Sequence, residues 1–344
     1  MQAVILAAGK STRTYPLTLT RPKPLLKVAN KTILEHNLNN LNKVVDEAIL
    51  IVGYKKAQIK QQFKNKYKNI KLKYVEQKEQ LGTGHAASLA EPYIKGKFIL
   101  MAGDDIYSRG DILNCVNHKY SILTSVTKSP QNFGVITEKN GILSDFIEKP
   151  EKFVSGIINT SFYTFDKKIF NCIEKIRKSE RNEYELPDAI RLLSKEEKII
   201  CLKSKQWLPI GYPWDLLKAD KILRNGINLI GNDSKITGKV INSGIGNNCT
   251  IKGTIKNSIV MDNAIIDEGS IIEDSVIGEN VYFKGKIKSK KNVYSYANGR
   301  KIKVEKLGAI IADNVKAKNV VVNAGCRIWP NKSISNKTVK GDLM

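Results

Sequence analysis

Phosphate binding is the first chemistry that the N-terminal residues suggest. The stretch LAAGKSTRTYPLT, residues 6–18, contains GKST, the last four letters of a P-loop. A P-loop also needs a glycine at the position of Val4, which lies inside a predicted strand, so the ATPase interpretation fails. Small residues at 7–9 instead predict a loop whose backbone lets a nucleotide approach and whose N–H groups bind an anion. Arg13 and Lys23 are two cations for a triphosphate.

Two further blocks suit nucleotide and metal binding. QKEQLGTGHAA, residues 77–87, begins with Gln77, whose amide can satisfy both the donor and the acceptor of a pyrimidine imide. GDD, residues 103–105, ends an apolar run, and a carboxylate there can hold Mg²⁺, a hard cation that takes oxygen ligands and bridges phosphates. These blocks predict a site for a pyrimidine nucleoside triphosphate with magnesium.

An α/β domain must position these groups. Amphipathic stretches at 33–44 and 56–67 have apolar residues at helical spacing, among short apolar runs. The predicted strands are AVILA (3–7), EAILIVG (47–53), KLKYVEQ (71–77), KFILMAGD (97–104), SILTSVT (121–127), FGVITE (133–138) and SFYTFD (161–166). This alternation indicates a largely parallel sheet, in which ligands bind outside the carboxyl ends of the strands.

The string LAAGKSTRTYPLTLTRPKPLLKV, residues 6–28, resembles the signature of the sugar-1-phosphate nucleotidylyltransferases, L-A-A-G-x-G-T-R-x-x-P-L-T-x-x-x-P-K-x-L. The resemblance implies a Rossmann-like α/β/α sandwich. One departure is Ser11, where the family usually has glycine. If this position needs a positive φ, serine costs about 1–2 kcal/mol there. Alternatively, the serine hydroxyl donates to a phosphate.

The resemblance also implies site residues. Arg13, Lys23 and Asp104 are the expected catalytic residues, with Asp104 as the ligand of Mg²⁺. The expected nucleotide-binding residues are Leu6, Ala7, Ala8, Gly9, Ser11, Thr12, Gln77, Gly82 and Thr83. The expected sugar-phosphate-binding residues are Gly134, Glu148, Lys149 and Asn159. The Gln77 loop resembles that of uridylyltransferases and favours UTP or dTTP, with glucose 1-phosphate or N-acetylglucosamine 1-phosphate as acceptor.

Two more departures lie in the weaker blocks. The string WLPIGYPWDLLKA, residues 207–219, resembles W-x-D-[IV]-G-x-P-x-D-L-L, but Pro209 replaces the aspartate that is a second Mg²⁺ ligand in many relatives. Asp215 is the nearest other carboxylate in the sequence. Ser161 replaces a glycine found in many relatives, which would narrow the sugar pocket.

The C-terminal part, residues 226–344, has a six-residue period. The expected core positions are Ile259, Ile265, Ile271, Ile277 and Phe283, with related spacings at Ile230 and Ile236, Ile245 and Ile251, and Val322, Ile328 and Ile334. This period predicts a hexapeptide parallel β-helix. The basic stretch 284–306 interrupts it and carries Asn298-Gly299, a hairpin turn signal, so we expect an inserted loop or hairpin.

Residues 1–225 followed by a left-handed β-helix resemble the archaeal-type bifunctional nucleotidylyltransferase/acetyltransferases and bacterial N-acetylglucosamine-1-phosphate uridylyltransferases. By that resemblance the β-helices pack as a homotrimer. Glu268 and Ile271 stand where the acetyl-transfer site has His and Tyr, so we expect that activity to be lost. The alternatives are a bifunctional enzyme that also uses acetyl-CoA, a catalytically dead nucleotide-binding subunit, and a guanylyltransferase acting on mannose 1-phosphate.

Composition limits the partners. The chain has 57 Lys and Arg against 33 Asp and Glu, a net charge of +24, spread over its whole length. Such a surface concentrates anions, including phosphorylated metabolites. The sequence has no nucleic-acid-binding motif, no apolar run of the roughly 20 residues that span a membrane, and no leader peptide. Five scattered cysteines fit reduced thiols, so we expect a cytoplasmic protein without nucleic-acid or membrane partners.

Overall fold

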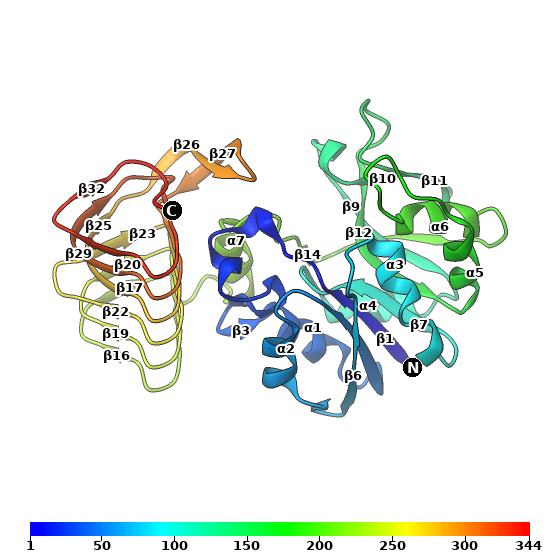
Figure 1. Ribbon diagram of the computed structural model, residues 1–344, viewed down its shortest axis with the longest axis horizontal. Helices are drawn as coiled ribbons and strands as arrows, with labels where there is room; N and C mark the ends of the chain where they lie inside the picture. The colour runs from blue at the N-terminus through cyan, green and yellow to red at the C-terminus, as the bar shows by residue number, and fades with distance from the viewer. The chain divides into compact units, whose positions relative to one another are not determined.

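Contacts divide the computed structural model, which describes residues 1–344, into two units. The first unit comprises Met1–Gly9 and Leu34–Pro209, and the second comprises Lys10–Ile33 and Ile210–Met344. Figure 1 labels many of the elements of both units. The chain contains no helix that is both long and apolar enough to cross a membrane.

A ten-stranded mixed sheet forms the centre of the first unit. Its strand order is β10 (Gly134–Lys139), β11 (Ile142–Glu148), β13 (Ile200–Lys203), β9 (Ser121–Val126), β12 (Ile157–Phe165), β7 (Phe98–Ala102), β1 (Gln2–Ala7), β4 (Glu47–Val52), β6 (Ile70–Glu76) and β5 (Lys66–Tyr67). Strands β7, β1, β4 and β6 are parallel, whereas β12 runs antiparallel to its neighbours β7 and β9. The predicted α/β sheet is thus confirmed, with β12 inserted antiparallel and with β11 and β5 also antiparallel to their neighbours.

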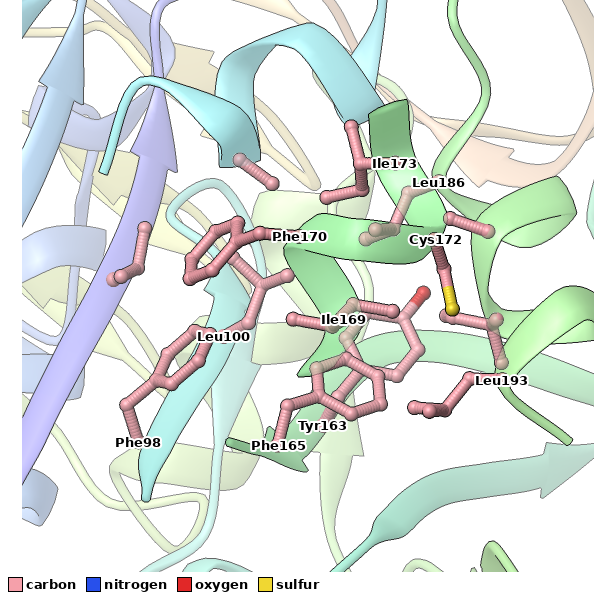
Figure 2. Close-up of a cluster of buried hydrophobic side chains, with 14 of the residues drawn as sticks. Phe98, Leu100, Tyr163, Phe165, Ile169, Phe170, Cys172, Ile173, Leu186 and Leu193 are labelled. Atoms are coloured by element: carbon pink, nitrogen blue, oxygen red, sulfur yellow. The ribbon is translucent and has the colours of Figure 1, made fainter. Parts of the chain in front are cut away.

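Both faces of this sheet are covered. The first unit carries α1 (Ile33–Leu41, whose first residue belongs to the second unit), α2 (Lys56–Phe63), α3 (Thr83–Ser88), α4 (Arg109–Val116), α5 (Lys168–Lys175) and α6 (Leu186–Leu193). Helices α3, α5 and α6 contact one another and pack on one face, where Figure 2 shows Phe98, Phe165 and Phe170 in a single apolar cluster. Alternate strand residues such as Ile5 and Ile99 are equally buried outside this cluster. Burial of both alternating sets is what an α/β/α sandwich requires.

The helix predicted over 56–67 ends early. It stops at Phe63 because Lys64 has a positive φ of 52°, which breaks the helical backbone. Lys66–Tyr67 then form β5, which pairs antiparallel with β6. The helical spacing of the apolar residues did not indicate this turn.

The second unit contains a parallel β-helix, as predicted, preceded by α7 (Asp215–Leu223). One wall stacks β15 (Leu229–Ile230), β18 (Gly244–Ile245), β21 (Ile259–Val260), β24 (Val276–Ile277), β28 (Ile310–Ile311) and β30 (Arg327–Ile328). A second wall stacks β16 (Lys235–Ile236), β19 (Thr250–Ile251), β22 (Ile265–Ile266), β25 (Tyr282–Ile287), β29 (Lys316–Val322) and β31 (Ser333–Ser335). The third wall contains β17 (Lys239–Ile241), β20 (Thr254–Lys256), β23 (Ile271–Glu273) and β32 (Thr338–Val339), of which β23 and β32 pair with the long strands β25 and β29.

The six-residue series assigned some core positions wrongly. Ile265 is 43% exposed and Ile271 is half-buried, while Ile266 and Ile272 occupy the apolar core. The reason is coil length: equivalent residues are 15 or 17 positions apart, as in the serine stack from Ser243 to Ser258 to Ser275, and neither number is a multiple of six. The inward position therefore shifts between coils.

An antiparallel hairpin projects from the coil. Strands β26 (Lys290–Ala297) and β27 (Arg300–Leu307) are joined by Asn298 and Gly299, both at positive φ, as a type I′ turn requires. Val293 and Val304 face each other on its buried side, whereas Tyr294 and Tyr296 are exposed.

Candidate active site

The carboxyl end of β1 is closely surrounded by backbone in the first unit. The Leu6 carbonyl accepts a hydrogen bond from the Gly103 N–H at 2.8 Å, and the Ala8 carbonyl accepts one from the Gln80 side-chain amide at 2.9 Å. A Cβ atom at Gly53 would lie 2.8 Å from the Ala8 oxygen, so that position must be glycine. Adjacent strands β4, β1 and β7 thus end in small residues at one edge of the sheet, the edge at which ligands bind in α/β folds.

The predicted base-recognition loop lies on the same sheet edge, after β6. Gln77 is buried, and its side-chain amide nitrogen donates to the Gly82 carbonyl at 3.1 Å and lies 3.2 Å from Nδ1 of His85. Gly82 has a φ of +101°, and a Cβ there would lie 2.5 Å from the Tyr184 carbonyl. Gln77 is therefore held in place by its own loop, with His85 as a partner that the sequence did not reveal.

A loop at residues 178–185, which the sequence did not indicate as part of the site, supports the base-recognition loop. The Gly84 N–H donates to the Tyr184 carbonyl at 2.8 Å, and the Leu186 N–H donates to the Thr83 hydroxyl at 3.1 Å. Arg181 extends from this loop to Glu148 at 3.7 Å and to Glu185 at 2.8 Å. Only the three-dimensional contact with Glu148 places this arginine next to the predicted sugar-phosphate residues.

Asp104 and Asp105 follow β7, and both are half-buried. Asp105 accepts a hydrogen bond from the Trp207 indole N–H at 3.1 Å. Strand β14 (Trp207–Leu208) pairs antiparallel with β8 (Ile106–Tyr107), with Leu208 opposite Ile106. The next residue, Pro209, is exposed and continues this register toward Asp105. The position of the missing second carboxylate is therefore beside the GDD turn.

The predicted sugar-phosphate residues come from β10, β11 and β12. Gly134 pairs directly with Glu148, and a Cβ at Gly134 would lie 2.8 Å from the Glu148 carboxylate and 2.6 Å from the Phe146 ring. The Lys149 ammonium is 3.5 Å from the Glu148 carboxylate and its side chain is exposed. The first unit thus brings Gly134, Glu148 and Lys149 together.

Asn159 lies on the neighbouring strand β12, where the pairing with β9 is interrupted. Its amide nitrogen donates to the Tyr163 hydroxyl at 2.8 Å, and its amide oxygen accepts from the Ser161 N–H at 2.8 Å. Ser161 has a φ of 61°, which explains why a glycine suits this position. Burial raises the pKa of Tyr163, so its hydroxyl stays protonated and neutral.

The remaining predicted residues lie in the second unit. Ser11 has a φ of 51°, so the left-handed alternative considered for it is confirmed. Its carbonyl accepts hydrogen bonds from the hydroxyls of Thr14 at 2.7 Å and Thr18 at 3.0 Å. The following 3-10 turn, η1 (Thr12–Thr14), presents Arg13 with an exposed side chain. An exposed guanidinium on a fixed turn is suited to binding an anion.

Lys23 is 4% exposed and begins the 3-10 turn η3 (Lys23–Leu25). Asp215 lies within its electrostatic reach. Burial raises the pKa of Asp215, although the N–H groups of Gly211 and Tyr212, at 2.8 and 2.7 Å, and the charge of Lys23 favour its ionised form. Asp215 caps the turn that precedes α7. The convergence of Arg13, Lys23 and Asp104 on one polyanion stays a prediction.

The chain matches known families over its whole length. Residues 2–226 match the Nucleotidyl transferase family, and residues 224–344 match the family described as GMPPB C-terminal domain. The chain is 37% identical to the Bifunctional protein GlmU of Methanocaldococcus jannaschii, over 92% of this chain and 88% of that protein. It is 35% identical to the UTP--glucose-1-phosphate uridylyltransferase AglF of Haloferax volcanii, over 65% of this chain and 97% of that protein.

Solved structures agree on the fold. A UDP-glucose pyrophosphorylase complexed with UDP-glucose is 21% identical with a TM-score of 0.59, covering 65% of this chain and 98% of that chain. Since the match to the Nucleotidyl transferase family covers residues 2–226, including the signature, the Gln77 loop and the GDD turn, the chain belongs to the nucleotidyl transferase family.

Proposed function

We propose that this protein is a sugar-1-phosphate nucleotidylyltransferase. It transfers a nucleotidyl group from UTP or dTTP to glucose 1-phosphate or N-acetylglucosamine 1-phosphate and releases pyrophosphate. The similarity to relatives named for uridylyl transfer and for sugar-1-phosphate nucleotidylyl transfer supports this substrate class. The observation that carries the proposal is the single edge of the sheet where the Leu6–Ala8 backbone, the Gln77 loop and Asp104 follow neighbouring strands.

The reaction needs no protein nucleophile. An oxygen of the sugar 1-phosphate attacks the α-phosphorus, and pyrophosphate leaves in line, so the protein must hold two anions together and neutralise charge. Arg13 and Lys23 bind the β- and γ-phosphates and the leaving pyrophosphate. Lys149, which is exposed beside Glu148, orients the incoming sugar phosphate. Gln77 hydrogen-bonds the base edge, and Gly134, Glu148 and Asn159 bind the sugar.

The donor set is compatible with Mg²⁺ at Asp104. Mg²⁺ usually binds through one or two carboxylates together with substrate phosphates and water, and does not need a cage of protein ligands. No group of three or more His, Cys, Asp or Glu side chains that could hold a metal occurs in the chain, and Asp105 is engaged by Trp207. Asp104 is the ligand that the resemblance to the family implies, and Mg²⁺ bound there would supply Lewis-acid stabilisation of the phosphate charge.

For residues 226–344 we propose assembly into a trimer without acetyl transfer. The three histidines of the chain, His36, His85 and His118, all precede this region, and Glu268 is an exposed carboxylate at the position of the expected base. Residues 1–225 form the catalytic domain in this proposal, and the protein acts in the cytoplasm. Release of free CoA from acetyl-CoA and glucosamine 1-phosphate would instead support the bifunctional alternative.

A matrix of triphosphates against sugar phosphates tests the proposal. UTP, dTTP, GTP and ATP are each combined with glucose 1-phosphate, N-acetylglucosamine 1-phosphate and mannose 1-phosphate, with Mg²⁺ or EDTA, and pyrophosphate is measured. We expect pyrophosphate with UTP or dTTP, and only with Mg²⁺. Turnover with GTP and mannose 1-phosphate would contradict this proposal and identify the protein as a guanylyltransferase. Nucleotide binding without turnover would identify a catalytically dead regulatory subunit.

A further inference from the structure

Three stacked carboxylates of the β-helix face the segment that carries Arg13 and Lys23. Asp262, Glu279 and Asp313 lie two residues after Val260, Ile277 and Ile311, which are paired on successive coils. We call these three residues the carboxylate ladder. All three side chains are at least half-buried, and they belong to the same unit as Lys10–Ile33. Stacked like charges repel one another, so the ladder needs cations.

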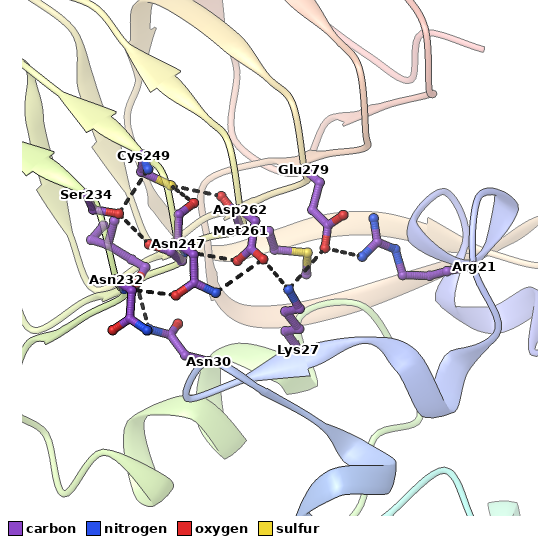
Figure 3. Close-up of polar contacts among 12 residues, drawn as sticks. Arg21, Lys27, Asn30, Asn232, Ser234, Asn247, Cys249, Met261, Asp262 and Glu279 are labelled. Carbon is purple, nitrogen blue, oxygen red and sulfur yellow. Dashed lines mark hydrogen bonds and ion pairs between the residues drawn. The ribbon is translucent and has the colours of Figure 1, made fainter. Parts of the chain in front are cut away.

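Two cations of Lys10–Ile33, hereafter the segment, supply that charge. Arg21 pairs with Glu279 and with Asp313, each at 2.5 Å, and the Lys27 ammonium contacts Asp262 and lies 3.5 Å from Glu279. Figure 3 shows Arg21 and Lys27 extending toward the coils, where dashed lines join them to Glu279 and Asp262. Burial disfavours the charge of Arg21, but the two carboxylates outweigh it and raise its pKa. The segment is thus held to the β-helix by charged contacts that are shielded from water.

Two of the ladder carboxylates also accept hydrogen bonds from the backbone of the β-helix. One oxygen of Asp313 accepts the Glu279 N–H at 2.7 Å, and one oxygen of Asp262 accepts the Asn247 N–H at 3.0 Å. In each case the other oxygen contacts the segment. A carboxylate held by the backbone of the preceding coil has little freedom, so its cation partner is held in a defined place.

These contacts flank Lys23 on both sides. Arg21 lies two residues before Lys23, and Lys27 lies four residues after it. The Thr20 hydroxyl also donates to Asp313 at 2.5 Å, and the Arg327 guanidinium donates to the Tyr15 carbonyl at 3.3 Å, two residues beyond Arg13. Each predicted phosphate-binding cation is therefore close in the sequence to a residue that the β-helix contacts.

We infer that Asp262, Glu279 and Asp313 are positioning residues for the nucleotidyl transfer reaction, and that the β-helix pre-organises Arg13 and Lys23 for the triphosphate through this ladder. The inference rests on the proposed function. It gives the β-helix a role in the reaction that is independent of acetyl transfer and of assembly. Displacement of a catalytic group by about 1 Å can cost on the order of 10²-fold in rate. Weakening the contacts of the ladder should therefore lower the rate of nucleotidyl transfer measurably.

The test compares Asp313→Asn, Arg21→Gln and the double variant in the full-length protein. Asp267→Asn is the matched control, because Asp267 also forms ion pairs on the β-helix, with Lys252 and Lys284, but these lie outside the segment. We expect Asp313→Asn to lower kcat/KM for the triphosphate by roughly 10- to 100-fold. The effect should appear in both kcat and KM for the triphosphate, with little change in KM for the sugar phosphate. The double variant should lose less than the two single losses combined, because Arg21 and Asp313 share one contact.

Amide hydrogen exchange of residues 11–27 separates this inference from the proposed function. We expect faster exchange there in Asp313→Asn and Arg21→Gln than in the wild type and in Asp267→Asn, whether or not the protein turns over UTP. If the wild type is inactive with every triphosphate, the proposed function fails. The exchange result then shows by itself whether the carboxylate ladder holds residues 11–27 in place. Unchanged exchange in the segment, or unchanged kcat/KM in an active protein, would overturn the inference.

Discussion

The indole N–H of Trp207 donates to the carboxylate of Asp105 at 3.1 Å, which joins strand β14 to the GDD turn after β7. Because β14 runs antiparallel to β8, this contact fixes where the following residue, Pro209, lies relative to the two aspartates. Pro209 follows Leu208, which pairs with Ile106, so its backbone lies next in this register to the GDD turn.

Pro209→Asp should strengthen Mg²⁺ binding. An added carboxylate beside the GDD turn would give the ion a second protein ligand, which is within its usual range of one or two. We expect the half-saturating Mg²⁺ concentration for pyrophosphate release to fall several-fold, with Pro209→Asn as the uncharged control. An equal response of the two variants would argue against a metal at Asp104.

Lys23→Ala should abolish most of the activity without unfolding the protein. Removing one pre-organised charge from such a site typically costs about 2.7–4 kcal/mol, or 10²–10³ in rate. Pyrophosphate release measures the loss, and circular dichroism measures the fold. Turnover near the wild-type rate would remove Lys23 from the phosphate-binding site.

Gly134→Ala should impair sugar binding. The new methyl group would lie 2.8 Å from the Glu148 carboxylate and 2.6 Å from the Phe146 ring, so one of them must move. We expect KM for the sugar phosphate to rise while KM for the triphosphate stays the same, with a stability loss of about 1–3 kcal/mol from overpacking. Gly96→Ala, where the methyl group would meet nothing within 4 Å, is the control.

Ser11→Gly should stabilise the protein. Ser11 has a φ of 51°, where a residue with a Cβ atom costs roughly 1–2 kcal/mol, partly offset by the larger chain entropy of glycine. A higher melting temperature is therefore expected. Ser129→Gly, at a φ of −129°, should lower it. A drop in stability for both would mean that the Ser11 side chain makes a compensating contact.

Asp111 should make the stability depend on pH. Burial tends to raise the pKa of this carboxyl, but the N–H groups of Lys205 and Gln206 and the Ser204 hydroxyl outweigh burial and lower it. A lowered folded pKa gives stability that is complete above the unfolded value of about 3.9 and is lost as the pH falls through the folded value.

Asp111→Asn removes that contribution. We expect the variant to be less stable than the wild type at pH 7, by about 1.5–3 kcal/mol for hydrogen bonds to a charged group, and the difference to shrink below pH 4. Urea unfolding across this pH range provides the measurement. A difference that stays constant with pH would show that the charge of Asp111 contributes nothing.

The sequence alone determined the fold class and the identity of most candidate residues. The alternation of apolar runs with amphipathic stretches and the aliphatic repeat are both local properties of the sequence. They therefore predicted the α/β domain and the β-helix without any knowledge of tertiary contacts. The signature, the Gln77 loop and the GDD turn were also contiguous strings. A left-handed backbone at Ser11 was one of two alternatives that its departure from the family pattern raised.

The tertiary structure decided what depends on distant residues. Equivalent residues of successive β-helix coils are 15 or 17 positions apart, so the residues that point into the core do not follow a strict six-residue period. Ile266, and not Ile265, therefore lies in the core. Arg181 gained a place beside Glu148, 33 positions earlier in the chain, because a loop folds back onto the sheet. The pairing of Arg21 with Asp313 joins residues 292 positions apart. Such contacts depend on the path of the whole chain, and neither residue type nor local spacing encodes them.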